Sequence, residues 1–354
     1  MTILVVDVGT SGVRAAVVGP DATVVADHHV EVLPDTPMAG LVEFDAGRMA
    51  EAALGAARRV LREGGPVEAV GIAAQRASTV VWERSTGEPV GPGLGWQDLR
   101  TVGECLALQA QGIKLAPNQT ATKAAALLDQ ADPERTRDLC VGTVDSWIAW
   151  HLSDGALHVT DTTNAAVTGL LVLDGRDWDH TVLEALRIPV GSLPRVVAST
   201  GAVGAATALD GAPPIAGIAG DQQASLIGQG CVHPGLAKIT FGTGAMLDRC
   251  VGPERPPFPR RGDGGTFPIV AWDDGELTWG VEAIMLSAGS NVEWLRDDLG
   301  VIGDAAESHE LAAACDDSEG VFYVPALLGL GTPEWDYGAR GTLLGLTRGT
   351  ERSH

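Results

Sequence analysis

Hydrophobic and polar positions alternate with turn residues at the start of the chain in a way that predicts a small sheet. Apolar runs at 3–8 and 13–18 and the stretch at 23–32 are separated by turns rich in Gly, Pro and Asp. This pattern is typical of three strands of an antiparallel meander. Residues 67–73 (VEAVGIA) form a further short apolar run that indicates a buried strand.

Between these strands the spacing of apolar residues changes to that of a helix. Residues 45–65 carry one apolar stripe, in which Asp45 is positioned to cap the start and Gly64-Gly65 to end the helix. The stripe consists of Met49, Ala53, Ala56, Val60 and Leu61. A meander, a helix and a returning strand together predict an α/β fold.

The rest of the chain divides at a linker signal, Asp210 to Pro214 (DGAPP), which predicts domains at 1–210 and 211–354. Helices are expected at 121–131 and 143–153 before it, and at 287–300 after it. The sequence between the linker and the last helix is again rich in strand-like runs.

One motif occurs in both halves: a strand, a tight turn with Gly and Thr, and a second strand. The first turn is Asp7-Val8-Gly9-Thr10-Ser11-Gly12, and the second is Gly242-Thr243-Gly244. Glycine lets backbone N–H groups approach an anion closely, and Thr adds a hydroxyl donor. Two such turns are suited to hold a polyphosphate, with Asp7 as a ligand for Mg²⁺. The alternative is that each motif only turns a hairpin.

A second group of residues points to chemistry on a hydroxyl. Asp221 follows the apolar run PPIAGIAG, where a carboxylate can accept the proton of an acceptor alcohol during phosphoryl transfer. Its alternative role is to cap the helix that follows. Arg76, next to Gln75 at the end of a strand, can bond to substrate hydroxyls, and Trp96 offers an apolar face to a polyol carbon chain. A surface Arg and a core Trp are the structural alternatives.

Composition narrows the class of protein. Apolar residues make up 45% of the 354 residues, yet no run of 18 apolar residues occurs, so no membrane span is expected. The N-terminus has no basic segment of the kind that opens a signal peptide. A net charge of −22 argues against nucleic-acid and anionic-membrane partners. Five widely spaced cysteines without a C-x-x-C motif favour a reducing, cytoplasmic compartment.

The order of these motifs resembles the FGGY carbohydrate kinase family, and within it the glycerol kinases. The matching stretches are VVDVGTSGVRAAVV, GIAAQRASTVVWERSTGEPVGPGLGWQDLRT, TVDSWIAWHL, PIAGIAGDQQASLIGQGCVHPGLAKITFGTGAML, AGSNVEWLRDDLG and YVPALLGLGTPEWDYGARGTLLGLTRGTERSH. The resemblance implies two actin-like ATPase domains of ribonuclease-H-like topology with a cleft between them. It also implies ATP- and Mg²⁺-dependent phosphorylation of a polyol or sugar hydroxyl.

The resemblance assigns roles to single positions. Asp221 corresponds to the general base, and the implied substrate contacts are Gln75, Arg76, Trp96, Asn118, Gln222 and Met246. The implied nucleotide contacts are Thr10, Ser11, Gly12, Arg14, Gly242, Thr243, Gly289 and Glu293. No further partner is implied beyond the small-molecule acceptor, and a homo-oligomer stays open.

The chain departs from the glycerol kinase pattern at several of these positions. Ala77 replaces a Glu that grips hydroxyls, Asn118 a Tyr, Met246 an aromatic residue and Glu293 a Gln. Each lost buried hydrogen bond costs roughly 1–3 kcal/mol, so weaker glycerol binding is expected. The family runs about 150 residues further than this chain, which predicts an incomplete second domain and a fragment with weakened ATP binding.

Three functions therefore stand at the sequence level. The first is an ATP-dependent kinase for glycerol or another polyol or sugar. The second is a catalytically impaired protein that keeps the fold, which the changes around Ala77 favour. The third, a non-kinase relative among the actin and chaperone ATPases, is disfavoured by the sugar-kinase stretches at 75–76 and 220–223.

Overall fold

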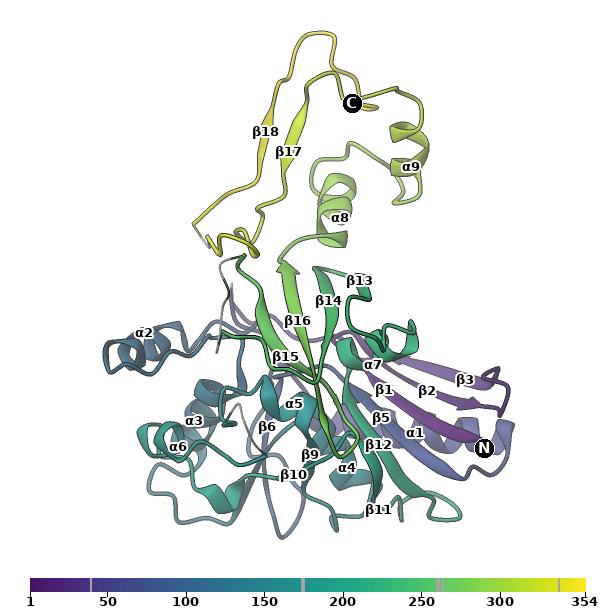
Figure 1. Cartoon of the computed structure of the whole chain (residues 1–354), viewed down its shortest axis with the longest axis vertical. Coiled ribbons are helices and arrows are strands. Elements are labelled where there is room, and N and C mark those ends of the chain that lie inside the picture. The colour runs from purple at the N-terminus through teal and green to yellow at the C-terminus, as the bar shows by residue number, and fades with distance from the viewer. Residues whose placement is uncertain (39, 173–175, 259–261, 263, 337) are drawn as a thin grey trace. The chain divides into compact units, whose positions relative to one another are not determined.

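A computed structural model describes the whole chain except residues 39, 173–175, 259–261, 263 and 337 (Figure 1). The chain forms two compact units. The first unit consists of residues 1–224 and 270–278, and the second of residues 225–269 and 279–354. The expected division between residues 210 and 211 stays a prediction.

A six-stranded sheet with the order β11-β12-β5-β1-β2-β3 lies at the centre of the first unit. Its strands are β1 (Ile3–Val8), β2 (Gly12–Val18), β3 (Val24–Glu31), β5 (Ala69–Ala74), β11 (Thr200–Ala205) and β12 (Pro214–Gly220). Strands β1, β2 and β3 pair antiparallel, which confirms the predicted meander. Strand β5 pairs parallel with β1 and β12 pairs parallel with β5, so an α/β fold is confirmed.

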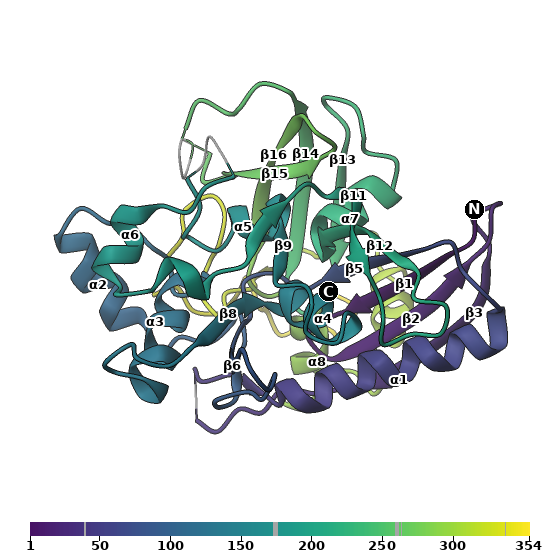
Figure 2. The same ribbon diagram turned by 90° about the horizontal axis from the view of Figure 1, so that it is seen from below.

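Helix α1 (Ala46–Gly64) packs lengthwise on this sheet, as Figure 2 shows. The Asp45 side chain caps it by accepting a bond from Arg48 N, and Gly65 ends it at a φ of 83°, as the sequence predicted. Small side chains let the helix approach the strands closely: a Cβ on Gly64 would lie 2.8 Å from Val17 Cβ. Of the predicted stripe, Leu61 is only partly buried.

The first unit has further elements beside the central sheet. A four-stranded sheet has the order β4-β7-β6-β8, and β9 and β10 form a parallel pair. These strands are β4 (Glu43–Phe44), β6 (Thr79–Glu83), β7 (Gly93–Leu94), β8 (Leu139–Thr143), β9 (Val159–Asp161) and β10 (Arg195–Val197). The helices are α2 (Val102–Ala110), α3 (Thr120–Ala131), α4 (Val144–Leu152), α5 (Thr162–Ala166) and α6 (His180–Ala185), with one 3₁₀ turn at Val190–Ser192. The two helices predicted at 121–131 and 143–153 are thus confirmed.

The second unit is built on the sheet β13-β14-β16-β15. Its elements are β13 (Ala237–Phe241), β14 (Ala245–Gly252), β15 (Phe267–Asp273), β16 (Leu277–Met285), α8 (Gly289–Asp297), α9 (Glu307–Ala312), β17 (Phe322–Val324) and β18 (Thr342–Leu344). The end of β15 and the start of β16 belong to the first unit, and helix α7 (Asp221–Gly228) begins in the first unit and ends in the second.

One sequence expectation needs correction. The helix predicted at 287–300 is shorter, because Ala288 has a non-helical backbone (φ −128°, ψ −88°) and α8 starts at Gly289 and ends at Asp297. Residues 210–213 lie in the connection between β11 and its antiparallel neighbour β12. Among the described residues, no helix is both long enough and apolar enough to cross a membrane.

Candidate functional site

Three neighbouring parallel strands end at the same edge of the central sheet and define the site in the first unit. Val8 of β1 lies opposite Ala74 of β5, and Ala74 lies opposite Gly220 of β12. The chain segments that follow these residues therefore leave the sheet side by side. Ligands bind in open α/β sheets beyond the carboxyl ends of the strands. This edge carries Asp7, Arg76 and Asp221.

Asp221 and Arg76 form an ion pair at this edge. Arg76 Nε lies 3.7 Å from Asp221 Oδ1, and their side chains are 11% and 33% exposed, respectively. Asp221 is also the first residue of α7, and its Oδ1 accepts a bond from Gln222 N at 2.8 Å. Both roles predicted for Asp221, a helix-capping group and a carboxylate facing a site, are therefore compatible with its position.

Asp7 is the second carboxylate of this group and is a solvent-exposed residue near the end of β1. Partial desolvation and the negative charge of Asp221 raise the pKa of Asp7, while Arg14 and His29 act in the opposite direction. Two carboxylates that repel one another at a strand edge are a donor set that a divalent cation stabilises. Among the described residues, no group of three or more His, Cys, Asp or Glu side chains is arranged to hold a metal ion.

A chain of hydrogen bonds connects the three loops around this edge. Gln75 Nε2 donates to Gly9 O at 3.1 Å, and Gln75 Oε1 accepts from Ser78 Oγ at 2.9 Å. Ser78 Oγ in turn accepts from Trp96 N at 3.0 Å. Trp96 Nε1 donates to Thr10 Oγ1 at 3.2 Å, which returns the chain to the first hairpin. Gln75 and Trp96 thus fix the loop geometry of the site.

Lys123 holds the segments that contain Trp96 and Asn118, and the sequence did not predict it as a site residue. Its side chain is completely buried, and Nζ donates to Gly95 O at 3.1 Å and Asn118 O at 3.3 Å. Burial lowers the pKa of Lys123 to about 7, opposed by the charges of Asp98 and Cys105. A lysine inside an alanine-rich helix, ATKAAALL, looks like a surface residue in sequence, so its burial appears only in the fold.

Ala77 stands where the glycerol kinases carry a glutamate, and its backbone is unusual. Its φ is 62°, in the left-handed region that non-glycine residues seldom adopt. Its carbonyl accepts bonds from Thr79 Oγ1 at 3.1 Å and Thr120 Oγ1 at 3.2 Å. Such conformations persist where surrounding contacts impose them, often at ligand sites. Asn118 is half-buried near this loop in the chain segment that leads into α3.

In the second unit, the turn between β13 and β14 is held by the start of α8. Gly289 N donates to Gly242 O at 2.8 Å, and Ala288 N donates to Thr243 O at 2.8 Å. Ser290 Oγ donates to the same Thr243 carbonyl at 3.1 Å. A Cβ on Gly289 would lie 2.6 Å from Gly242 O, so this glycine allows the helix to approach the turn.

Glu293 and Met246 lie in different surroundings of the second unit. Glu293 lines a pocket of about 350 Å³ on one side of α8, together with Ser287, Ser290, Trp294, Asp297, Asp298, Leu327 and Leu328. Met246 lies on β14, opposite Thr240 and Ile284 of the neighbouring strands. Met246, a predicted substrate contact, is therefore not among the residues that line the pocket beside Glu293, a predicted nucleotide contact.

The glycines of the two turns differ in what surrounds them. A Cβ on Gly12 would lie 2.4 Å from His29 Nε2 and 2.9 Å from Val30 O, and one on Gly244 would lie 2.7 Å from Met285 O. Gly9 and Gly242 have no neighbour closer than 3.5 Å and 3.7 Å, respectively. Internal packing therefore requires one glycine of each turn, while a Cβ on the other would make only ordinary van der Waals contact with the turn itself.

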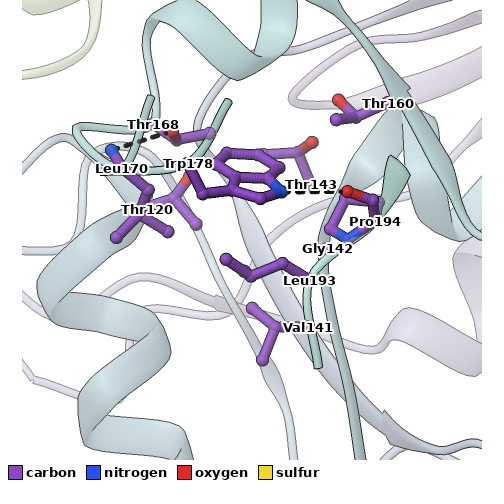
Figure 3. Close-up of a pocket in the computed structure, with 10 residues that line it drawn as sticks. All are labelled: Thr120, Val141, Gly142, Thr143, Thr160, Thr168, Leu170, Trp178, Leu193 and Pro194. Carbon is purple, nitrogen blue, oxygen red and sulfur yellow. Dashed lines mark hydrogen bonds between the residues drawn. The ribbon is translucent and has the colours of Figure 1, made fainter. Parts of the chain in front are cut away.

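A small cavity in the first unit lies apart from these groups. Figure 3 shows Trp178, whose Nε1 donates to Pro194 O at 3.1 Å, and Leu170, whose N donates to Thr168 Oγ1 at 3.1 Å, on its wall. Its volume of about 10 Å³ has room for one water molecule at most. Three buried threonines, Thr120, Thr143 and Thr160, also line it. The cavity is too small to be a substrate site.

The comparisons with known proteins agree with this architecture. The model for the N-terminal domain of the FGGY family of carbohydrate kinases matches residues 2–228, and the model for its C-terminal domain matches residues 237–354. The chain therefore belongs to the FGGY family of carbohydrate kinases. The α/β FGGY-type fold expected from the sequence is confirmed.

Individual relatives place the chain near one branch of that family. A glycerol kinase from Aromatoleum aromaticum is 42% identical over 373 residues, which cover 99% of this chain and 74% of that protein. The crystal structure of Plasmodium falciparum glycerol kinase with ADP has a TM-score of 0.87 at 25% identity, covering 99% of this chain and 74% of that one. A ligand-bound xylulose kinase from Lactobacillus acidophilus has a TM-score of 0.85 at 20% identity, with coverage of 99% and 74%, and shares the fold.

Proposed function

We propose that the protein transfers the γ-phosphoryl group of ATP to a hydroxyl of a small polyol or sugar. The observation that supports this most is the meeting of Asp7, Arg76 and Asp221 at the carboxyl ends of β1, β5 and β12. Family membership and similarity to glycerol kinases make glycerol the first acceptor to test.

In the proposed reaction Asp221 acts as the general base. Its carboxylate accepts the proton of the acceptor hydroxyl as that oxygen forms a bond to the γ-phosphorus. The bond from the γ-phosphorus to the bridging oxygen breaks, and its electrons leave with ADP. Arg76, at 3.7 Å, favours the ionised form of Asp221 that this step requires.

The phosphates of the nucleotide are proposed to contact the two glycine turns. Thr10, Ser11 and Gly12 belong to the first turn, Arg14 lies on β2 directly after it, and Gly242 and Thr243 belong to the second turn. The absence of a side chain at Gly9 and Gly242, where a Cβ would meet no atom closer than 3.5 Å, supports a close approach of an anion to the backbone there. Gly289 and Glu293 are proposed as further nucleotide contacts.

Mg²⁺ is proposed to accompany the nucleotide, held by Asp7 with Asp221 nearby. Desolvation and, after it, repulsion by Asp221 raise the pKa of Asp7, and this repulsion is the feature of the site that fits a divalent cation. When bound, Mg²⁺ neutralises charge on the phosphate oxygens. Asp7 supplies a fixed anionic ligand and Arg14 a compensating positive charge beside it.

The acceptor is proposed to lie against Trp96, with Arg76 and Gln222 as polar contacts and Asn118, Gln75 and Met246 in supporting positions. Gln75 already makes two hydrogen bonds within the protein, so its contribution is to orient the loop. With Ala77 in place of a carboxylate, the site offers one acceptor group fewer to a triol. A longer polyol or a ketose can compensate through more hydroxyl contacts.

ADP release, measured with glycerol, other polyols, ketoses and aldoses, tests the proposal. One acceptor class is expected to stimulate release, and Asp221→Ala is expected to lower kcat by about 10²–10⁴-fold, the usual contribution of a general base. Arg59→Ala, which removes a surface ion pair, serves as the matched control. ATP binding without stimulation by any acceptor would instead identify a catalytically impaired member of the family.

A further inference from the structure

A buried threonine holds the residue that precedes Asp221. Gly220 N donates to Thr163 Oγ1 at 2.9 Å, and the Thr163 side chain is completely buried in α5. Position 220 has no room for a larger residue, because a Cβ there would lie 2.7 Å from Arg76 Cδ. The backbone at the end of β12 therefore runs tightly between Arg76 and Thr163.

The direction of the Thr163 hydroxyl is fixed by a buried carboxylate. Thr163 Oγ1 donates to Asp161 Oδ1 at 2.9 Å. The Asp161 carboxylate also accepts hydrogen bonds from Thr163 N, Asn164 N and Asn164 Nδ2. Since the hydroxyl proton points to Asp161, a lone pair of Thr163 Oγ1 faces the Gly220 N–H.

Asp161 reaches β12 by a second route. It accepts a bond from Ser199 Oγ at 2.7 Å, and Ser199 O accepts from Ile218 N at 3.0 Å. Asp161 thereby fixes β12 at Ile218 and at Gly220, on either side of Ala219. Every side-chain atom in these links is buried, so water does not replace a lost bond easily.

We propose that Thr163 and Asp161 are positioning residues for Asp221: they set the height and direction of the carboxylate at the end of β12 relative to Arg76. The inference rests on the proposed function of Asp221 as general base. Loss of the Thr163 hydroxyl frees the Gly220 peptide, so the Asp221 carboxylate is no longer held in place beside Arg76.

Hydrogen exchange tests the link without any assay of activity. Thr163→Val removes the hydroxyl at nearly constant volume, and Thr163→Ser keeps it. Thr168→Val is the matched control, because Thr168 is equally buried and its Oγ donates to Ala165 O and accepts from Leu170 N, away from β12. Amides of residues 218–222 are expected to exchange about 5- to 10-fold faster in Thr163→Val, the effect of losing one hydrogen bond. Unchanged exchange there overturns the proposal.

Kinetics test the consequence for catalysis. With the acceptor found for the wild type, Thr163→Val is expected to lower kcat by about 10- to 100-fold with KM for ATP unchanged. Thr163→Ser should restore kcat. An unchanged kcat, in a variant whose exchange is accelerated, overturns the positioning role. If no acceptor is found for the wild type, the proposed function fails, whereas exchange at 218–222 still decides whether Thr163 holds β12.

Discussion

Among single residues, Lys123 shows how a site can depend on a side chain that does not reach it. Its Nζ bonds to Gly95 O, one residue before Trp96, and to Asn118 O. Both proposed acceptor loops therefore rest on one buried amine. Burial of an ammonium is costly, and among the described residues no carboxylate forms a salt bridge with Lys123, so desolvation lowers its pKa to about 7.

Lys123→Met is expected to weaken acceptor use. The variant keeps a long apolar stem but leaves two carbonyls without their donor, a loss of roughly 1–3 kcal/mol. The value of kcat/KM for the acceptor should fall by about 10- to 100-fold, while KM for ATP stays constant. Steady-state kinetics check this, with the exposed Lys114→Met as control. An unchanged KM for the acceptor would show that the two loops do not need Lys123.

The sequence predicted the chemical groups of the site better than their connections. Asp221 and Arg76 are recognisable from short stretches, and the structure brings them to 3.7 Å. The partners of Gln75 and Trp96 were not predictable, because the hydrogen bonds from Gln75 to Gly9 and from Trp96 to Thr10 join residues 66 and 86 positions apart. Such contacts depend on strand register, which a local pattern does not contain.

Among the elements, the two glycine turns combine a structural and a proposed functional requirement. Both were predicted from the sequence as hairpins, and both connect antiparallel neighbours. Their glycines look equivalent in sequence, yet a Cβ on Gly244 would lie 2.7 Å from Met285 O, whereas one on Gly242 would lie 3.7 Å from its nearest neighbour, Gly244 O. Only the packing distinguishes them.

This difference predicts opposite outcomes for two neighbouring substitutions. Gly244→Ala is expected to lower the free energy of unfolding by about 1–3 kcal/mol, because the Cβ overlaps a backbone carbonyl of β16. Gly242→Ala should fold normally but bind ADP more weakly, because its methyl group fills the space proposed for a phosphate. Urea unfolding and isothermal titration with ADP measure the two quantities. Equal ADP affinity in Gly242→Ala and the wild type would contradict a phosphate contact at this turn.

Element ends were less predictable than element types. Helix α8 is two residues shorter at its start than the apolar spacing suggested, because Ala288 N and Gly289 N bond to the carbonyls of the neighbouring turn. The competing tertiary contacts decide where the helix begins, as they commonly do. The parallel pairing of β1, β5 and β12 was also beyond a local pattern, although each strand was recognisable by itself.

In the whole molecule, buried carboxylates couple stability to pH. Asp145 is completely buried, and desolvation together with the nearby Asp161 raises its pKa to about 7, against hydrogen bonds from Thr143 and Thr160. Between about pH 4 and pH 7 the folded protein then holds a proton on Asp145 that the unfolded chain has lost. The free energy of unfolding is therefore expected to fall as the pH rises through this range.

Asp145→Asn should remove part of this pH dependence. The amide is neutral at every pH, and the hydroxyls of Thr143 and Thr160 can each donate or accept a bond. The variant is expected to gain stability relative to the wild type at pH 8 and to lose that advantage at pH 5, with a difference of a few kcal/mol at most. Urea unfolding at both pH values checks this, with the exposed Asp27→Asn as control. Parallel pH profiles of variant and wild type would show that Asp145 does not titrate in this range.

The path of the chain between the two units affects how the protein is synthesised. Residues 270–278 belong to the first unit although they follow 45 residues of the second, and Asp273 bonds there to Thr162, Arg176 and Ser199. During translation, residues 1–224 of the first unit therefore leave the ribosome before residues 270–278 of the same unit. The first unit is therefore incomplete until residue 278 has been translated and residues 270–278 have left the ribosomal exit tunnel.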